Sequence, residues 1–114
     1  LVEITREAET LRQADAIILP GQGAFAACRA GLDALDGMVA ALYEAVQLHG
    51  RPMLGICVGM QLLAQKGLEH GETPGLAWLP GVVAPMDPRT PDGSPLPLPQ
   101  MGWNALAIHR PHPV

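Results

Sequence analysis

The residue whose type and surroundings are best suited to chemistry is Cys57. It lies in Gly55-Ile56-Cys57-Val58-Gly59, where an apolar run gives way to a helical pattern. A Gly-x-Cys-x-Gly at such a junction has the form of a nucleophile elbow, in which small flanking residues let strand and helix approach each other. A free cysteine is more often a small buried hydrophobe, but such a residue does not need a glycine on each side. The pattern therefore predicts that Cys57 is a nucleophile at a sharp turn.

The expected surroundings of Cys57 would activate its sulfur and stabilise an oxyanion. A helix that starts directly after Cys57 places the positive end of its dipole at the sulfur, which favours the thiolate. The backbone N–H of Val58 is one expected donor to the oxyanion. A second donor is expected from another loop at the carboxyl edge of the sheet, where the glycine-rich turn 20–23 lies.

The same glycine-rich turn fits a rival interpretation as a dinucleotide-binding loop. Residues 21–26 read Gly-x-Gly-x-x-Ala between an expected strand and an expected helix. That fingerprint requires an acidic residue at the end of a second strand ~20 residues later, whereas Glu44 lies inside an expected helix. Pro20 also removes a backbone donor that would hold a pyrophosphate. Nucleotide binding is therefore the weaker alternative.

The remaining cysteine and the C-terminal histidines carry no comparable pattern. Cys28 has no base, glycine turn or metal partner near it in the sequence and is interpreted as an ordinary packing residue. His109 and His112 have the spacing of a ligand pair, but they lie in a proline-broken tail without a third ligand. Neither a metal site nor a cofactor is predicted.

The elements that must position Cys57 alternate between strands and helices. Residues 16–19 predict a strand buried on both faces, and 52–56 predict the next one. Residues 35–50 predict an amphipathic helix between them, and a further helix is expected from Cys57 to Gly67. This order predicts an α/β fold with an open, mostly parallel sheet flanked by helices, and a site at the carboxyl ends of the strands.

The flanking regions predict smaller elements. A strand end is expected at 2–4 and a helical turn at 7–13. Beyond Gly71 the chain becomes rich in proline, which predicts a loop of low order joining short strands. These strands are expected near Ala77, at 82–84 and at 105–108.

Size and charge limit the functional classes. The 114 residues, of 12.0 kDa and 48% hydrophobic, allow one core, a single domain over 1–114. The net charge of −4, with seven Lys and Arg that do not cluster, disfavours nucleic acid and membrane partners. No signal peptide or membrane-spanning run is recognisable, so a cytoplasmic setting is expected. The starting Leu1 and the unclosed C-terminal end lead us to expect an internal fragment that is incomplete at both ends.

Three motifs resemble the glutaminase subunits of imidazole glycerol phosphate synthase, a histidine-biosynthesis family of triad-type glutamine amidotransferases. Residues 55–61, Gly-Ile-Cys-Val-Gly-Met-Gln, look like the nucleophile segment of the whole superfamily. Residues 19–25, Leu-Pro-Gly-Gln-Gly-Ala-Phe, look like its Pro-Gly-x-Gly loop. Residues 99–104, Pro-Gln-Met-Gly-Trp-Asn, are close to Pro-His-Met-Gly-Trp-Asn, which selects the histidine-pathway member.

This resemblance implies roles for the residues of the first two motifs. Cys57 would attack the carboxamide of L-glutamine, form a thioester, release ammonia and then yield glutamate to water. Val58 and Gln22 would form the oxyanion hole. Gly21, Gly23 and Gln61 would contact glutamine.

The third motif implies a partner. Met101, Trp103 and Asn104 would face the barrel-shaped cyclase subunit that receives the ammonia and makes imidazole glycerol phosphate.

The sequence also departs from the family pattern. Gln100 replaces a histidine and Gln22 replaces a small apolar residue, which bears on coupling to the cyclase. The catalytic His and Glu of the family lie beyond Val114, and His109 and His112 lack the His-Pro-Glu context. We therefore expect the chain alone to be inactive.

Other functions remain open on the sequence alone. The glutaminase of GMP, CTP or carbamoyl phosphate synthesis would share the Cys57 turn but not Met-Gly-Trp-Asn. A dienelactone-type hydrolase would share the elbow but not Gln61 in this motif. A noncatalytic partner-binding module is the alternative from another class.

Overall fold

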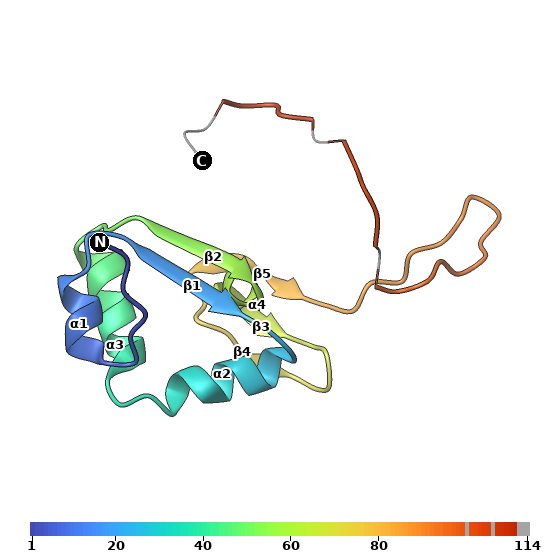
Figure 1. Ribbon diagram of the computed structural model, residues 1–114. Coiled ribbons are helices and arrows are strands. Elements are labelled where there is room, and N and C mark those ends of the chain that lie inside the picture. Colours follow the sequence, from blue (N-terminus) through green and yellow to red (C-terminus); the bar gives the residue numbers. More distant parts are fainter. Residues whose placement is uncertain (100, 106, 112–114) are drawn as a thin grey trace.

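The computed structural model describes residues 1–99, 101–105 and 107–111 as two small sheets with helices packed against them (Figure 1). In chain order the elements are α1 (Ala8–Gln13), β1 (Ile17–Gly21), α2 (Phe25–Asp33), α3 (Met38–Tyr43), the π-helix η1 (Glu44–Leu48), β2 (Met53–Cys57), α4 (Val58–Gln61), β3 (Ala64–Gly67), β4 (Thr73–Pro74) and β5 (Leu79–Val83). The mixed α/β class predicted from the sequence is confirmed.

The central pair is parallel, as predicted. β1 and β2 run in register from Ile17 beside Met53 to Gly21 beside Cys57. The chain crosses between them through α2, α3 and η1. Since both strands end at the same edge, the turns that follow Gly21 and Cys57 are neighbours.

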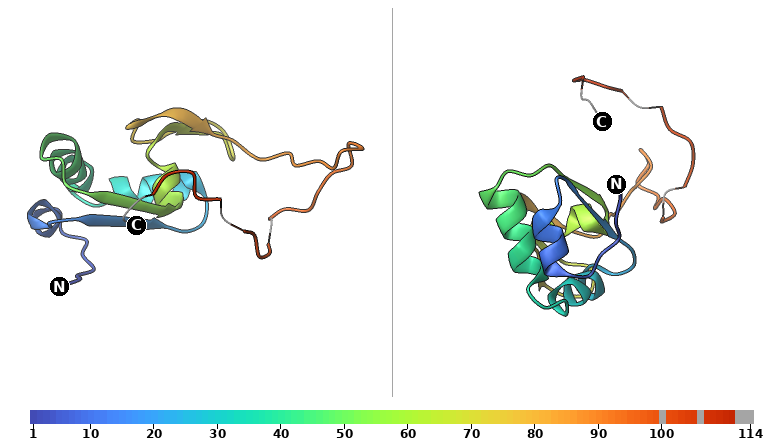
Figure 2. Two further views of the ribbon diagram at one scale, coloured as in Figure 1. Left: turned by 90° about the horizontal axis from the view of Figure 1, so that it is seen from above. Right: turned by 60° about the vertical axis from the view of Figure 1, so that its left-hand side comes forward.

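The second sheet has three strands in the order β4-β3-β5, with β5 parallel and β4 antiparallel to β3. Helix α4 contacts β1, β2 and β3, and it therefore connects the two sheets. Figure 2 shows α2 and α4 between the β1-β2 pair and the strand β5.

Burial of β1 on both faces was predicted and is wrong for the described residues. Ile17 is 7% exposed, but its neighbour Ile18 is 60% exposed. Helices cover only one side of the pair, so Leu54 and Ile56 of β2 are also exposed. Alternating burial of this kind is typical of a sheet with one open face.

The helix expected from Cys57 to Gly67 is much shorter than predicted. α4 ends at Gln61, and the residues of its expected second half form β3. The carbonyl oxygen of Leu62 accepts the N–H of Leu76 at 2.7 Å, and the carbonyl oxygen of Leu63 accepts the N–H groups of residues 78 and 79 at 2.9 Å. These long-range hydrogen bonds take the place of the bonds that would have continued the helix.

The helix predicted over residues 35–50 is present but starts later and changes form. Gly37, with φ +68°, precedes α3. From Glu44 the winding widens to a π-helix, and the N–H of His49 donates to the Glu44 carbonyl at 3.0 Å. The end expected at His49 and Gly50 is confirmed.

The flanking predictions are partly confirmed. The helical turn before Asp15 is α1, whereas residues 2–4 form no strand and are exposed. The strand expected at 82–84 corresponds to β5, whereas the strand expected near Ala77 is wrong, because Ala77 lies between β4 and β5 and belongs to neither. The described residues of 105–108 form no strand, and the segment after β5 leads away from the helices and sheets (Figures 1 and 2).

One hydrophobic core holds the helices and the two sheets together. It comprises Leu11, Ile17, Phe25, Leu32, Met38, Ala41, Leu42, Ala45, Val58 and Leu62. None of the described helices has the length and apolar character needed to cross a bilayer.

Candidate active site

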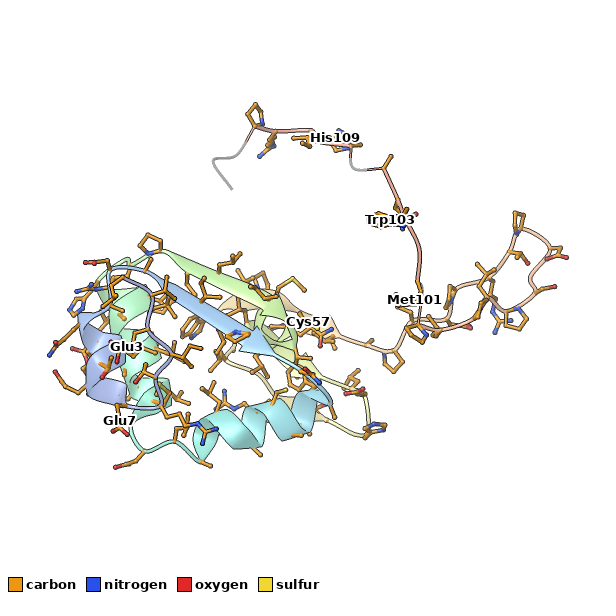
Figure 3. The ribbon with its side chains drawn as sticks, in the orientation of Figure 1. Glu3, Glu7, Cys57, Met101, Trp103 and His109 are labelled. Atoms are coloured by element: carbon orange, nitrogen blue, oxygen red, sulfur yellow. The ribbon has the colours of Figure 1, made fainter. Side chains whose placement is uncertain are left out.

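Cys57 occupies a strained turn between β2 and α4. Its backbone has φ +55° and ψ −121°, and its side chain is exposed at the carboxyl edge of the strand (Figure 3). Positive φ is uncommon for a residue with a Cβ and costs on the order of 1–3 kcal/mol. A reactive side chain presented on such a turn is the geometry of a nucleophile elbow.

The two glycines that flank Cys57 are required by close backbone approaches. A Cβ on Gly55 would lie 2.6 Å from the Cα of Met60, and a Cβ on Gly59 would lie 1.9 Å from the carbonyl oxygen of Leu19. Both obstacles are backbone atoms that cannot rotate away. The requirement for small residues at these positions, inferred from the spacing, therefore has a direct structural cause.

The glycine-rich loop after β1 lies against the Cys57 turn. Gly21 is the register partner of Cys57, and a Cβ on Gly21 would lie 2.5 Å from the nitrogen of Gly59 and 3.0 Å from the Cβ of Val58. Gly23 follows at φ +94°, with open space around its Cβ position. The structure thus brings together the two segments that were predicted to share the site.

Helix α4 places the remaining predicted residues of this half of the site. Val58 starts the helix, with its side chain 5% exposed, so the backbone is the part of Val58 that the site can use. Gln61 ends the helix, one turn after Cys57, and is partly buried. Because α4 has only 4 residues, its dipole stabilises a thiolate less than the longer predicted helix would have done.

Two residues that sequence reasoning did not assign to the site hold the glycine-rich loop. The carboxylate of Glu69 accepts the N–H of Phe25, the first residue of α2, at 2.9 Å. The thiol of Cys28 donates to the carbonyl oxygen of Gln22 at 3.1 Å. Neither contact has a signal in the sequence, because Glu69 lies far along the chain and Cys28 reads as an ordinary helix residue.

The predicted partner residues lie on the C-terminal segment, and Figure 3 shows Met101 and Trp103 away from Cys57. Met101 is 84% exposed, Trp103 is 105% exposed and Asn104 is also exposed. His109 lies further along the same segment, also away from Cys57 (Figure 3). Gln100 and His112 lie outside the described residues.

A groove on the surface lies away from the Cys57 turn. An open groove of about 710 Å³ runs between α2, α3, η1 and the segment before β5, lined by residues that include Arg29, Tyr43 and Trp78. Cys57 does not line it, so its size says nothing about the chemistry at the turn. Among the described ranges, no cluster of three or more His, Cys, Asp or Glu side chains could hold a metal ion.

Comparison with known families matches residues 1–104 to the model described as glutamine amidotransferase class-I. The match includes both segments of the site and the predicted partner residues.

Curated relatives carry a more specific name. The chain is 53% identical over 113 residues to the imidazole glycerol phosphate synthase subunit HisH of Bradyrhizobium diazoefficiens, covering 99% of this chain and 51% of the relative. It is 51% identical over 105 residues to the protein of the same name from Rhodospirillum rubrum, covering 92% and 48%. The chain therefore spans about half the length of the curated relatives it matches.

Proposed function

Because this chain belongs to the class-I glutamine amidotransferase family, we propose that Cys57 is the nucleophile of a glutaminase that supplies ammonia for histidine biosynthesis. The observation that carries the proposal is the φ +55° turn at Cys57, held between two glycines that have no room for a Cβ. A packing cysteine has no need of such a turn. Residues 1–114 then form part of one amidotransferase domain.

The proposed reaction has two steps on the Cys57 sulfur. The thiolate adds to the side-chain carboxamide of L-glutamine, the C–N bond breaks, and ammonia leaves after taking up a proton. Water then attacks the thioester, the C–S bond breaks, and glutamate leaves with the thiolate restored. Each step passes through an oxyanion, so the donors around the sulfur control the rate.

The loop and the turn would divide the remaining tasks. We assign the oxyanion hole to the backbone N–H groups of Val58 and Gln22, which lie on the two segments that meet at Gly21 and Cys57. The substrate glutamine would lie against Gly21, Gly23 and Gln61. Support comes from the contact between Gly21 and Val58, since it keeps the two proposed donors near one sulfur.

Ammonia released at Cys57 needs an acceptor, and we propose a cyclase subunit that makes imidazole glycerol phosphate. The relatives are named as a subunit of imidazole glycerol phosphate synthase. The exposed Met101, Trp103 and Asn104 are our candidates for the contact with this partner. An aromatic side chain that is fully exposed in the free protein is the kind of residue that anchors an interface.

The reaction also needs a base that transfers protons, and His109 lies away from Cys57 (Figure 3). We therefore assign it to the family's His and Glu, outside this chain. Their role would be to protonate the leaving ammonia and to activate the deacylating water.

The test uses the full-length protein mixed with its cyclase subunit and measures glutamate release from glutamine. Cys57→Ala should abolish turnover, whereas His49→Ala, at an exposed helix end, should retain it. Turnover by Cys57→Ala at the wild-type rate would disprove the assignment of the nucleophile. Cyclase binding without any glutamate release by the wild type would favour a noncatalytic partner-binding module.

A further inference from the structure

Cys28 of helix α2 forms a hydrogen bond to the loop that would supply the second oxyanion donor. The Cys28 thiol donates to the carbonyl oxygen of Gln22 at 3.1 Å, and the Cys28 backbone N–H donates to the carbonyl oxygen of Ala24 at 3.0 Å. The backbone bond is the first hydrogen bond of α2, whose N-cap is Ala24, and the thiol bond is the contact that reaches the loop. The Cys28 side chain is partly buried and packs against the core, so its position is well defined.

The start of α2 is itself held against the second sheet. The helix that carries the Cys28 thiol is therefore fixed in position. Phe25 is 2% exposed, and a Cβ on Gly67 would lie 2.6 Å from its ring. The Phe25 N–H is bound by the Glu69 carboxylate at 2.9 Å. Side chain and backbone of the same residue therefore connect α2 to the end of β3.

The peptide group between Gln22 and Gly23 has few other restraints. Gln22 is exposed, and the Cβ position of Gly23 has nothing within 4 Å. Gly23 also has φ +94°, a region that glycine can enter and leave at low cost. The thiol hydrogen bond turns the Gln22 carbonyl toward α2 and so selects one orientation of this peptide plane.

We propose that Cys28 is a positioning residue of the active site: its thiol holds the Gln22 carbonyl and so restrains the backbone of Gln22, whose own N–H is the proposed second donor to the oxyanion at Cys57. This inference rests on the proposed glutaminase function. Cys28 touches neither substrate nor sulfur and acts only through the loop. It therefore has a role beyond the ordinary packing assigned from the sequence.

The expected effect is moderate. Removing an oxyanion donor outright costs about 10²–10³ in kcat, whereas Cys28 only restrains a donor. A thiol is a weak donor, so we expect Cys28→Ala to lower kcat about three- to tenfold. The KM for glutamine should change little, because the oxyanion forms only during reaction.

The experiment measures kcat and KM for glutamate release by the full-length protein with its cyclase subunit. Cys28→Ser keeps a hydrogen-bond donor of similar size and should restore most of the kcat lost in Cys28→Ala. Hydrogen exchange of the amides of residues 21–24 should be faster in the Ala variant and near wild type in the Ser variant. The matched control is Ala27→Ser, which adds the same hydroxyl to an exposed neighbouring position and should change neither readout.

Equal kcat and equal loop exchange in the wild type and Cys28→Ala would overturn the inference, as would equal losses in the Ala and Ser variants. If Cys28→Ala does not fold, Cys28→Val serves as the variant without a donor, and the same difference from Cys28→Ser is required. A wild type that releases no glutamate would refute the proposed function instead. Loop exchange alone would then decide whether Cys28 holds the loop.

Discussion

The carbonyl oxygen of Leu19 lies 1.9 Å from the point where a Cβ on Gly59 would be. Leu19 belongs to β1, and Gly59 follows the Cys57 turn, so the first strand and the proposed nucleophile turn touch backbone to backbone. The approach is possible only because residue 59 has no side chain. The same glycine therefore allows β1 to pack against the turn and allows the turn to expose Cys57.

We expect Gly59→Ala to destabilise the protein and to displace the Cys57 turn. The added methyl group must push β1 or α4 aside, at a cost of about 2–4 kcal/mol. Urea denaturation followed by circular dichroism measures the change. Gly31→Ala is the matched control, because its Cβ position in α2 is open and loss of a helical glycine should stabilise by ~0.5–1 kcal/mol. Equal midpoints for the two variants would contradict the packing described for Gly59.

Glu69→Ala should loosen the start of α2. The substitution leaves the Phe25 N–H without its carboxylate acceptor, a loss comparable to that of a helix cap and worth ~1 kcal/mol. The comparison variant is Glu72→Ala, which removes the exposed ion pair with Lys66 and should cost at most ~0.5 kcal/mol. Both are measured by thermal unfolding at the same pH and ionic strength. A larger loss for Glu72 than for Glu69 would show that the cap is unimportant.

Ala77→Gly should stabilise the protein, unlike most glycine substitutions. Ala77 has φ +57°, a left-handed conformation that costs a residue with a Cβ roughly 1–2 kcal/mol. Part of that strain is offset by the greater freedom of glycine in the unfolded chain, so a net gain of ~0.5–1 kcal/mol is expected. Ala27→Gly, in the first turn of α2, should instead lose about that much, and scanning calorimetry distinguishes the two signs.

The parts of the fold that could be predicted from the sequence are those with local causes. β1, β2 and the glycine-flanked turn at Cys57 follow from short apolar runs that end in residues with special backbone freedom. The nearness of Gly21 to Cys57 follows from parallel pairing, because both strands end at one edge. The two segments of the candidate site, and their nearness to each other, could therefore be predicted from the sequence.

The parts that could not be predicted depend on partners distant in the chain. Residues 64–67 carry a helical pattern but form β3, because residues 76–79 supply N–H groups to the carbonyl oxygens of residues 62–64. The Glu69 contact with Phe25 spans 44 positions in the sequence. No periodicity or motif encodes such a pair, and the same holds for the hydrogen bond between Cys28 and Gln22.

Trp103→Ala, in the full-length protein, should weaken binding to the cyclase subunit by more than ~1 kcal/mol, a roughly fivefold or larger rise in Kd. The reason is that Trp103 is fully exposed in the free chain and would lose that exposure in the complex. Isothermal titration with the cyclase subunit gives the affinity. His109→Ala, exposed on the same segment, is the control and should bind normally. If the Trp103 variant bound the cyclase subunit with wild-type affinity, the assignment of Trp103 to the interface would be wrong.

The last prediction concerns the 114-residue chain itself: a chloroketone analogue of glutamine should alkylate it at Cys57 rather than at Cys28. The Cys57 thiol is exposed on the strained turn, whereas the Cys28 thiol is partly buried and bonded to the Gln22 carbonyl. Mass-spectrometric mapping after brief treatment locates the adduct, and Cys57→Ser should abolish it.

The same chain should not turn over glutamine at ordinary enzymatic rates. Alkylation needs only the sulfur and its turn, which are local, whereas turnover needs a base for the leaving ammonia and for the deacylating water. Loss of such a base removes about 10⁴ in rate in comparable triads. An assay for glutamate under the labelling conditions tests this expectation. Labelling mainly at Cys28, or rapid glutamate release by the chain alone, would mean that the chemistry does not depend on Cys57 and a separate base in the way argued above.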